Sequence, residues 1–454
     1  MNKTITALAT PPGVGGIAVI RISGDEAISI SDACFSGKIS LLESKSHTIH
    51  YGTIQYNDRI IDTVTAAVFR SPNSYTGDNV VEISCHGGMV VASEIIEIMI
   101  ANGAVQAEAG EFTKRAFLNG KLDLTQVEAV ADIIHSLSVP GCMTAARQLT
   151  GEFTARLKAL RVKLLDIASL LELELDFSEE DIEFTNRDNI KLLIKETRDY
   201  CNDLADSFKS AEILRSGFFV AIAGYPNSGK STLFNTLLQR KRAIVSEIPG
   251  TTRDYLEEMI YSNGIAIRLT DTAGLRPSEN IIEIEGIKLV ETVMEQSDLI
   301  LIINDISISP GNSDKLLKTI KAKYTNSKAY LLQNKIDKVD SAQLDTLSPE
   351  SENEIRISAK KGIGVDTLKE ILEKEASQSI DRTKDILVNQ RHALLLRQSA
   401  LELSNALTAI ESNLENEIIA IDIRSSAKTL GEITGDTWDE DVLNNIFSRF
   451  CIGK

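Results

Sequence analysis

The feature that most constrains this chain is an octapeptide at residues 224–231, Gly-Tyr-Pro-Asn-Ser-Gly-Lys-Ser. An apolar run precedes it at residues 218–223, and residues 232–238 continue with a helical composition. A strand, a glycine-rich turn and a helix in this order are typical of a loop that wraps phosphates with backbone NH groups. Lys230 would place a positive charge at the β and γ phosphates, and the Ser231 hydroxyl would bind Mg²⁺. We therefore predict a nucleotide-binding loop.

Length and composition bound the remaining possibilities. The 454 residues suggest about three domains. The net charge of −17 argues against nucleic-acid binding through diffuse basic charge, but not against a local basic patch or a partner that binds RNA. The five cysteines are scattered without a Cys-x-x-Cys pair, as in reduced cytosolic proteins. Neither a signal peptide nor a transmembrane helix is expected, so we predict a cytoplasmic protein.

Residues 1–119 are rich in β-branched residues, turns and glycine. Strands are predicted at residues 17–22, 63–69 and 80–84, and a helix at residues 90–100. This segment is predicted to be a mixed α+β domain.

Residues 120–215 have helical periodicity and few turn residues. Three long helical patterns cover about residues 122–137, 143–175 and 187–210. Pro140-Gly141 is expected to break the first of them. This segment is predicted to be the first part of a helical domain.

Residues 216–377 alternate strand and helix patterns, as in a doubly wound α/β domain. Asn263-Gly264 between two strand-like runs predicts a hairpin. Continuous apolar runs at residues 299–303 and 329–332 are typical of buried parallel strands.

Residues 378–454 return to a helical composition, with helices predicted at about 389–414 and 425–433. The simplest interpretation is an α/β domain inserted into a helical bundle. The two helical segments, 120–215 and 378–454, would then pack together.

Four motifs accompany the phosphate loop in the order of a GTPase. Thr251-Thr252 lies where a mobile switch would meet Mg²⁺. Asp271-Thr272-Ala273-Gly274 offers a carboxylate that can hold Mg²⁺ through water and a glycine amide for the γ-phosphate. Asn334-Lys335-Ile336-Asp337 offers a carboxylate to the two hydrogens of guanine N1 and N2, and Ser358-Ala359-Lys360 offers a backbone NH to the guanine oxygen. Together they predict a GTPase domain.

Two details bear on hydrolysis. Leu275 stands where Ras-type enzymes have a glutamine that orients the attacking water, so water must be positioned otherwise. The Asn227 side-chain oxygen, with carbonyls of residues 246–254, could hold a monovalent cation in the role of an arginine finger. Asn227 could equally satisfy its own loop backbone, and spacing alone leaves both interpretations open.

The set resembles translation-factor-related GTPases that carry a hydrophobic residue in place of the catalytic glutamine. The whole chain resembles one family among them, the tRNA modification GTPase MnmE, also called TrmE. Outside the GTPase motifs the resemblance rests on residues 18–24 (AVIRISG), 74–78 (SYTGD), 86–88 (HGG), 115–124 (RAFLNGKLDL) and 450–454 (FCIGK).

The resemblance implies an N-terminal domain that dimerises and binds 5-formyl- or methylene-tetrahydrofolate. The matching positions for folate are Arg21, Glu82, Lys121 and Lys454. Cationic side chains suit the glutamate tail of folate, and a carboxylate suits its pterin edge. From the residues alone, Arg21 and Lys121 could be ordinary surface charges, and Glu82 could face solvent.

The resemblance also implies metal ligands in the GTPase domain: Ser231 and Thr252 for Mg²⁺, and Asn227, Ser246, Ile248 and Thr251 for K⁺, which drives the association of two G domains. The residues assigned to guanine-nucleotide binding are Asn227, Ser228, Gly229, Lys230, Ser231, Thr232, Ser246, Glu247, Ile248, Pro249, Gly250, Thr251, Thr252, Asp271, Thr272, Ala273, Gly274, Asn334, Lys335, Asp337, Ser358, Ala359 and Lys360.

Two residues are predicted to be catalytic by the resemblance. Glu283 matches a water-positioning glutamate, although its neighbour Glu285 fits nearly as well and either could be a solvated helix charge. Cys451 matches a cysteine essential to RNA modification, whereas an isolated cysteine would more often be a small apolar contact. Cys85 and His86 are not predicted to act as a pair, because adjacent strand residues point to opposite faces.

The function implied is that of a GTP-hydrolysing tRNA modification enzyme. As a homodimer, in a heterotetramer with the flavin- and NADH-dependent protein MnmG (GidA), it would add an aminomethyl or carboxymethylaminomethyl group to C5 of the wobble uridine, position 34, of certain tRNAs. Tetrahydrofolate would be the one-carbon donor. Two alternatives are a regulatory GTPase in ribosome assembly without RNA chemistry, and a folate enzyme with a GTP sensor.

Overall fold

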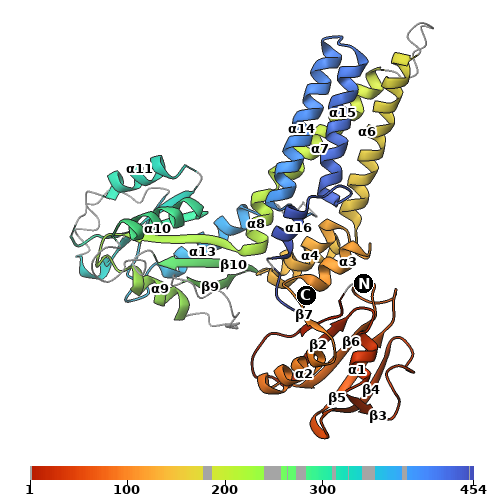
Figure 1. The fold of residues 1–454 in the computed structure, drawn as a ribbon. Coiled ribbons are helices and arrows are strands. Elements are labelled where there is room, and N and C mark those ends of the chain that lie inside the picture. The colour runs from red at the N-terminus through yellow and green to blue at the C-terminus, as the bar shows by residue number, and fades with distance from the viewer. Residues whose placement is uncertain are drawn as a thin grey trace. The chain divides into compact units, whose positions relative to one another are not determined.

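A computed structural model describes residues 3–176, 187–239, 257–262, 264–271, 283–308, 313–325, 327–339, 353–380, 386–448 and 450–454. The chain forms two compact units (Figure 1). The first unit contains residues 1–131, 148–201 and 394–454, and the second contains residues 132–147 and 202–393. The domain boundaries given above stay predictions.

The first unit contains a seven-stranded sheet, which we call the N-terminal sheet, in the order β3-β4-β5-β6-β2-β1-β7. One face is covered by helices, because alternate residues such as Ile20 and Ile22 pack with Ile95 and Met99. The predicted α+β domain is confirmed. Its elements are β1 Ile5–Leu8, β2 Ile17–Ser23, α1 Ala27–Asp32, β3 Phe35–Gly37, β4 Thr48–Tyr56, β5 Arg59–Phe69, β6 Val80–His86, α2 Met89–Ala101, β7 Val105–Gln106 and α3 Glu111–Leu118.

The other face of the N-terminal sheet, which we call the open face because its residues on β4 are exposed, carries both apolar and charged side chains. Ile49 on β4 is 72% exposed and Tyr51 is 73% exposed. Ile49 pairs with Ala67, Ala67 with Glu82, and Glu82 with Arg21, so these side chains lie in one row across β4, β5, β6 and β2.

The first unit also contains most of the long helices, and α15 packs along α6. The helices are α4 Leu124–His135, α5 Val139–Leu149, α6 Glu152–Asp176, α7 Arg187–Asp206, α14 Gln390–Glu411, α15 Asn416–Thr434 and α16 Glu440–Phe447, of which α4, α5, α7 and α14 extend into the second unit.

Three helix predictions need correction. The pattern at 143–175 is two helices, because Gly151 adopts a left-handed φ of 83° between α5 and α6. The predicted break after the first pattern is present, but it lies at residues 136–138 between α4 and α5, and Pro140 itself lies in the first turn of α5, where a missing NH costs nothing. The pattern at 187–210 is likewise two helices, α7 and α8 (Phe208–Ser216).

The second unit contains a six-stranded sheet, which we call the central sheet, in the order β13-β12-β11-β8-β10-β9. All neighbours are parallel except β9 and β10, so the predicted hairpin is confirmed, although Asn263 itself lies outside the described residues. Its remaining elements are β8 Phe218–Gly224, α9 Lys230–Gln239, β9 Glu257–Ser262, β10 Ile265–Asp271, α10 Glu283–Gln296, β11 Leu299–Asp305, α11 Ser313–Lys323, β12 Lys328–Asn334, the 3₁₀ turn η3 Ile336–Lys338, β13 Glu354–Arg356 and α13 Val365–Gln378.

Hydrophobic clusters lie on both faces of the central sheet. Alternate residues of β8 pack into different clusters, with Val220 and Ile222 in one and Phe219 and Ala221 in the other. The predicted doubly wound α/β class is therefore confirmed. In such sheets a ligand binds beyond the carboxyl ends of the parallel strands. Here those ends carry Gly224, Asp271, Asp305 and Asn334.

Two absences apply to the described residues. None of their helices has the length and apolar character needed to cross a lipid bilayer. All five cysteines lie in the described ranges and are free, as predicted.

Candidate functional site

The phosphate loop joins β8 to α9 in a conformation that requires its glycines. Gly224 has a φ of 150° and Gly229 a φ of 103°. A Cβ at Gly224 would lie 2.3 Å from the carbonyl oxygen of Ile303, and one at Gly229 would lie 2.2 Å from Nδ2 of Asn334. Both positions therefore exclude larger residues, and the loop is held against the ends of β11 and β12.

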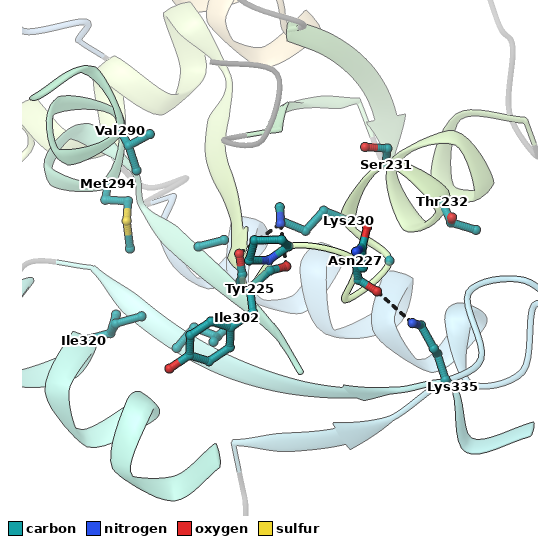
Figure 2. Close-up of a pocket in the computed structure, with 14 residues that line it drawn as sticks. Tyr225, Asn227, Lys230, Ser231, Thr232, Val290, Met294, Ile302, Ile320 and Lys335 are labelled. Carbon is teal, nitrogen blue, oxygen red and sulfur yellow. Dashed lines mark hydrogen bonds between the residues drawn. The ribbon is translucent and has the colours of Figure 1, made fainter. Parts of the chain in front are cut away.

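The loop lines a cavity of about 740 Å³ (Figure 2). Lys230 Nζ donates to the carbonyls of Gly224 and Tyr225, each at 2.9 Å. The ammonium group is thus held at the concave side of the loop, where a phosphate would meet it together with the N-terminus of α9.

The magnesium ligands predicted from the sequence are brought together where the structure describes them. Ser231 Oγ donates to Asp271 Oδ2 at 2.9 Å. Asp271 ends β10 and is buried. A hydroxyl and a carboxylate oxygen at this separation suit Mg²⁺, which prefers hard oxygen ligands.

The base-recognition motifs meet through Asn334. Its Nδ2 donates to the Ser228 carbonyl at 2.8 Å, and its Oδ1 accepts from the Ala359 NH at 3.0 Å. The carboxylate of Asp337 accepts from Ser358 Oγ at 2.5 Å, and this hydrogen bond is the main reason that its pKa lies below the usual value. Asp337 is therefore ionised at neutral pH, as an acceptor for guanine N1 and N2 must be. Lys360 is exposed beside this pair.

Lys335 joins the base motif to the phosphate loop. It has a left-handed φ of 68°, and its Nζ donates to the carbonyl of Asn227 at 2.7 Å (Figure 2). Asn227 is exposed, lines the cavity and has a φ of 61°. Thr232 lines the same cavity.

The remaining GTPase predictions fall outside the described residues. These are Ser246, Glu247, Ile248, Pro249, Gly250, Thr251, Thr252, Thr272, Ala273, Gly274 and Leu275. Glu283 begins α10, but the side chains of Glu283 and Glu285 are also outside the description. The K⁺ set, Thr252 as a Mg²⁺ ligand and the choice between the two glutamates stay predictions.

A second cluster lies on the open face of the N-terminal sheet. Arg21 Nε contacts Glu82 Oε1 at 2.8 Å, and Arg21 Nη1 donates to the Gly453 carbonyl at 3.3 Å. The guanidinium group lies 5.3 Å from the ring centre of Tyr75 and 5.6 Å from that of Phe112. Aromatic rings and opposite charges therefore fix the orientation of Arg21.

Three of the four predicted folate residues are close together. The pKa of Lys454 is lowered by burial and then by the positive charge of Arg21, while Glu82 opposes this. Lys121 is different: it is exposed, and its Nζ donates to the Pro72 carbonyl at 3.1 Å. The Lys121 side chain therefore contacts the loop that leads to Tyr75 rather than the Arg21–Glu82 pair.

The tail at residues 450–454 is packed against the first strand. Ile452 forms a bridge with Ala109, and Gly453 has a φ of 100°. A Cβ at Gly453 would lie 2.1 Å from the Leu8 carbonyl oxygen. Cys451 is exposed, and its carbonyl accepts from the Lys454 NH at 3.3 Å. The exposed thiol acts electrostatically on Lys454 and therefore lies beside the cluster.

Cys85 has the properties of a structural cysteine. It is buried, and burial raises its pKa to about 11. The neighbouring His86 is exposed and pairs with Asp62 at 2.7 Å. The buried Cys85 and the exposed His86 therefore point to opposite faces of β6, as expected for adjacent strand residues.

Three residues at these sites were not singled out from the sequence. Tyr75 and Phe112 flank Arg21, and Asp305 contacts Lys335. Asp305 carried a usable signal, because it follows a continuous apolar strand just as Asp271 and Asn334 do. Phe112 carried none, since an aromatic residue in an amphipathic helix usually belongs to the core.

Comparisons with known proteins agree along the whole chain. Residues 124–451 match the family described as MnmE helical domain, and residues 4–121 match that described as GTP-binding protein TrmE N-terminus. The protein named tRNA modification GTPase MnmE of Christiangramia forsetii is 41% identical over 100% of both chains. The protein of the same name in Cytophaga hutchinsonii is 42% identical over 100% of this chain and 98% of its own, and that of Flavobacterium psychrophilum is 42% identical over 100% and 99%.

Proposed function

The chain belongs to the family of tRNA modification GTPases named MnmE, and on that premise we propose that it couples GTP hydrolysis to tRNA chemistry. The product is an aminomethyl or carboxymethylaminomethyl group on C5 of the wobble uridine of certain tRNAs. A flavin- and NADH-dependent partner, MnmG (GidA), supplies the redox step, and tetrahydrofolate supplies the carbon. The reaction takes place in the cytoplasm.

The nucleotide site supports GTP and Mg²⁺ as the cofactors. Lys230 and Ser231 follow β8, Asp271 ends β10 and the ionised Asp337 follows β12, so all four lie at the carboxyl edge of the central sheet. Their chemistry matches triphosphate, magnesium and guanine in that order. We propose that K⁺ completes the site at Asn227 and that it promotes pairing of two G domains.

The Arg21 cluster supports a folate. Its guanidinium and the Lys454 ammonium suit the glutamate carboxylates, the Glu82 carboxylate suits a pterin edge, and the partly exposed Tyr75 offers aromatic surface. The single observation that carries the proposal is the hydrogen bond from Arg21 to Gly453. It brings the Cys451 tail to the proposed carbon donor, which a regulatory GTPase has no need to do.

The partners follow from the same surfaces. We propose a homodimer through the open face of the N-terminal sheet, where Ile49 and Tyr51 are exposed. A chain with a net charge of −17 repels the tRNA phosphates over most of its surface. We therefore propose that the flavoprotein supplies much of the tRNA contact in the heterotetramer.

The test is the nucleoside profile of tRNA from cells that lack this protein. We expect the modified wobble uridine to disappear, and to return with the wild-type chain and with Cys142→Ser, a control cysteine in the second unit. Lys230→Ala and Cys451→Ser should not restore it. An unchanged profile together with altered ribosome sedimentation would instead establish the regulatory GTPase and refute the proposal.

A further inference from the structure

Asp305, at the end of β11, holds a position that the family motifs do not include. Its Oδ2 lies 2.5 Å from Lys335 Nζ, and only 9% of its side chain is exposed. Its Oδ1 accepts from the backbone NH of Ser307 at 3.1 Å and from the Ser307 hydroxyl at 2.6 Å. Burial raises the pKa of Asp305, but the hydrogen bonds from Lys335 and Ser307 more than offset this, so the pKa lies below its usual value. The group is a fixed negative charge at neutral pH.

Lys335 also contacts the phosphate loop. The same Nζ donates to the Asn227 carbonyl at 2.7 Å, so one ammonium group bridges a carboxylate and the loop backbone. Figure 2 shows the side chain of Lys335 reaching from the end of β12 to Asn227. Asp305, Lys335 and Asn227 are therefore connected in a continuous row of polar contacts.

The row has an electrostatic consequence for a cation bound at Asn227. An ammonium group within hydrogen-bond distance of the Asn227 backbone repels any second cation there, and Lys230 adds a further positive charge in the same loop. The carboxylate of Asp305 cancels the first of these charges at contact distance. The pair is mostly buried, so solvent screens it only in part.

We propose that Asp305 is a positioning residue that neutralises Lys335 and thereby allows a monovalent cation to bind at Asn227. The Lys335 side chain can then reach from the base-recognition motif and hold the phosphate loop without repelling K⁺. This inference rests on the K⁺ activation put forward under the proposed function. It adds Asp305, which is not a K⁺ ligand, to the residues that favour K⁺ binding, and it explains why this residue carries a negative charge.

The experiment measures GTP hydrolysis by the full-length chain at saturating GTP and Mg²⁺ as KCl is varied, with ionic strength held constant by choline chloride. Asp305→Asn should raise the half-saturating K⁺ concentration about 3- to 10-fold, with a smaller effect on the maximal rate. Asp305→Glu, which keeps the charge, should restore most of the K⁺ affinity. Lys335→Met should shift the half-saturating concentration in the opposite direction, to lower K⁺.

The matched control is Glu291→Gln. It removes one negative charge from another ion pair of the same domain, Glu291 with Lys323, which is exposed and connects α10 to α11. We expect its half-saturating K⁺ concentration to equal that of the wild type.

The outcomes distinguish a failure of the proposed K⁺ activation from a failure of the proposed role of Asp305. Equal wild-type rates in KCl and NaCl would refute the proposed K⁺ activation itself. A K⁺-activated wild type with an unshifted Asp305→Asn variant would overturn the role of Asp305. Upward shifts in both Asp305→Asn and Lys335→Met would show that the pair only supports the loop structurally, which also overturns charge neutralisation. If Asp305→Asn fails to bind GDP, the Lys335→Met variant decides alone. A lower half-saturating K⁺ concentration supports charge neutralisation, and a higher one overturns it.

Discussion

At the scale of single residues, Asn227 combines two properties that the phosphate loop needs. It adopts a left-handed φ of 61°, which asparagine tolerates better than other side chains do. Its backbone carbonyl accepts a hydrogen bond from Lys335, and the residue is exposed where it lines the nucleotide cavity. The side-chain amide is thus left to face a ligand.

Replacing Asn227 should abolish the preference for K⁺. Asn227→Gly permits the same left-handed backbone and removes the side chain with its amide, so the GTPase rate in K⁺ should fall at least about 10-fold, to the rate in Na⁺. The measurement is phosphate release in matched KCl and NaCl buffers. Asn235→Ala, at an exposed position of α9, serves as the control and should keep the preference. A persistent K⁺ preference in Asn227→Gly would mean that other groups hold the cation.

Gly453 is the residue on which the tail depends. Gly453→Ala adds a Cβ that collides with the Leu8 carbonyl and forces an L-residue to a φ of 100°, a strain of at least about 1–2 kcal/mol. We expect tRNA modification to fall sharply while GTP hydrolysis stays at the wild-type rate. Ile452→Ala, which trims an exposed side chain next to it, should change neither. Normal modification by Gly453→Ala would show that the docked tail is dispensable.

At the scale of elements, α14 and α15 share a buried acidic site. Glu402 on α14 accepts hydrogen bonds from Gln398, Ser425 and Thr429. Asp422 lies on α15, and its pKa is raised by burial and then by the negative charge of Glu402. The folded state therefore disfavours ionised Asp422, which destabilises it at neutral pH but not below the pKa of the unfolded chain, near 4.

Asp422→Asn should accordingly stabilise these helices at pH 7. The expected gain is less than about 1 kcal/mol, because the group is partly solvated, and it should shrink as the pH falls towards 4. Hydrogen exchange of α15 amides would report it. Asp436→Asn provides the contrast, since Asp436 contacts Lys158 and Arg161 and its loss should destabilise. Faster exchange of the α15 amides in Asp422→Asn than in the wild type at pH 7 would contradict the expected stabilisation.

The elements also show what a sequence can and cannot reveal. β8, β11 and β12 were predictable because buried parallel strands are continuous apolar runs, and the site residues at their ends followed from them. Helix ends were not, because periodicity continues across Gly151 while the break depends on its local φ. From the residues alone the contact of Arg21 with the tail was equally hidden, since pairing between positions so distant leaves no local pattern, and only the resemblance placed Arg21 and Lys454 in one site.

At the scale of the whole molecule, the open face of the N-terminal sheet should determine the oligomeric state. Ile49→Glu combined with Tyr51→Glu places like charges opposite one another in a symmetric interface, so we expect a monomer by light scattering. Val162→Glu, at an exposed apolar position of α6, should remain dimeric. A dimeric double variant would place the interface elsewhere.

The contact between Arg21 and Gly453 spans 432 positions of the chain, and this separation sets the order of events during synthesis. Translation adds about 5–20 residues per second, so Arg21 is synthesised roughly 20 to 90 s before Gly453. Throughout that interval the sheet can fold, but its Arg21 cluster lacks the cysteine beside it. An interrupted chain can therefore carry a folded front domain and a working nucleotide site without acquiring the chemistry of the tail. The proposed RNA chemistry thus requires a chain that has been synthesised through Gly453.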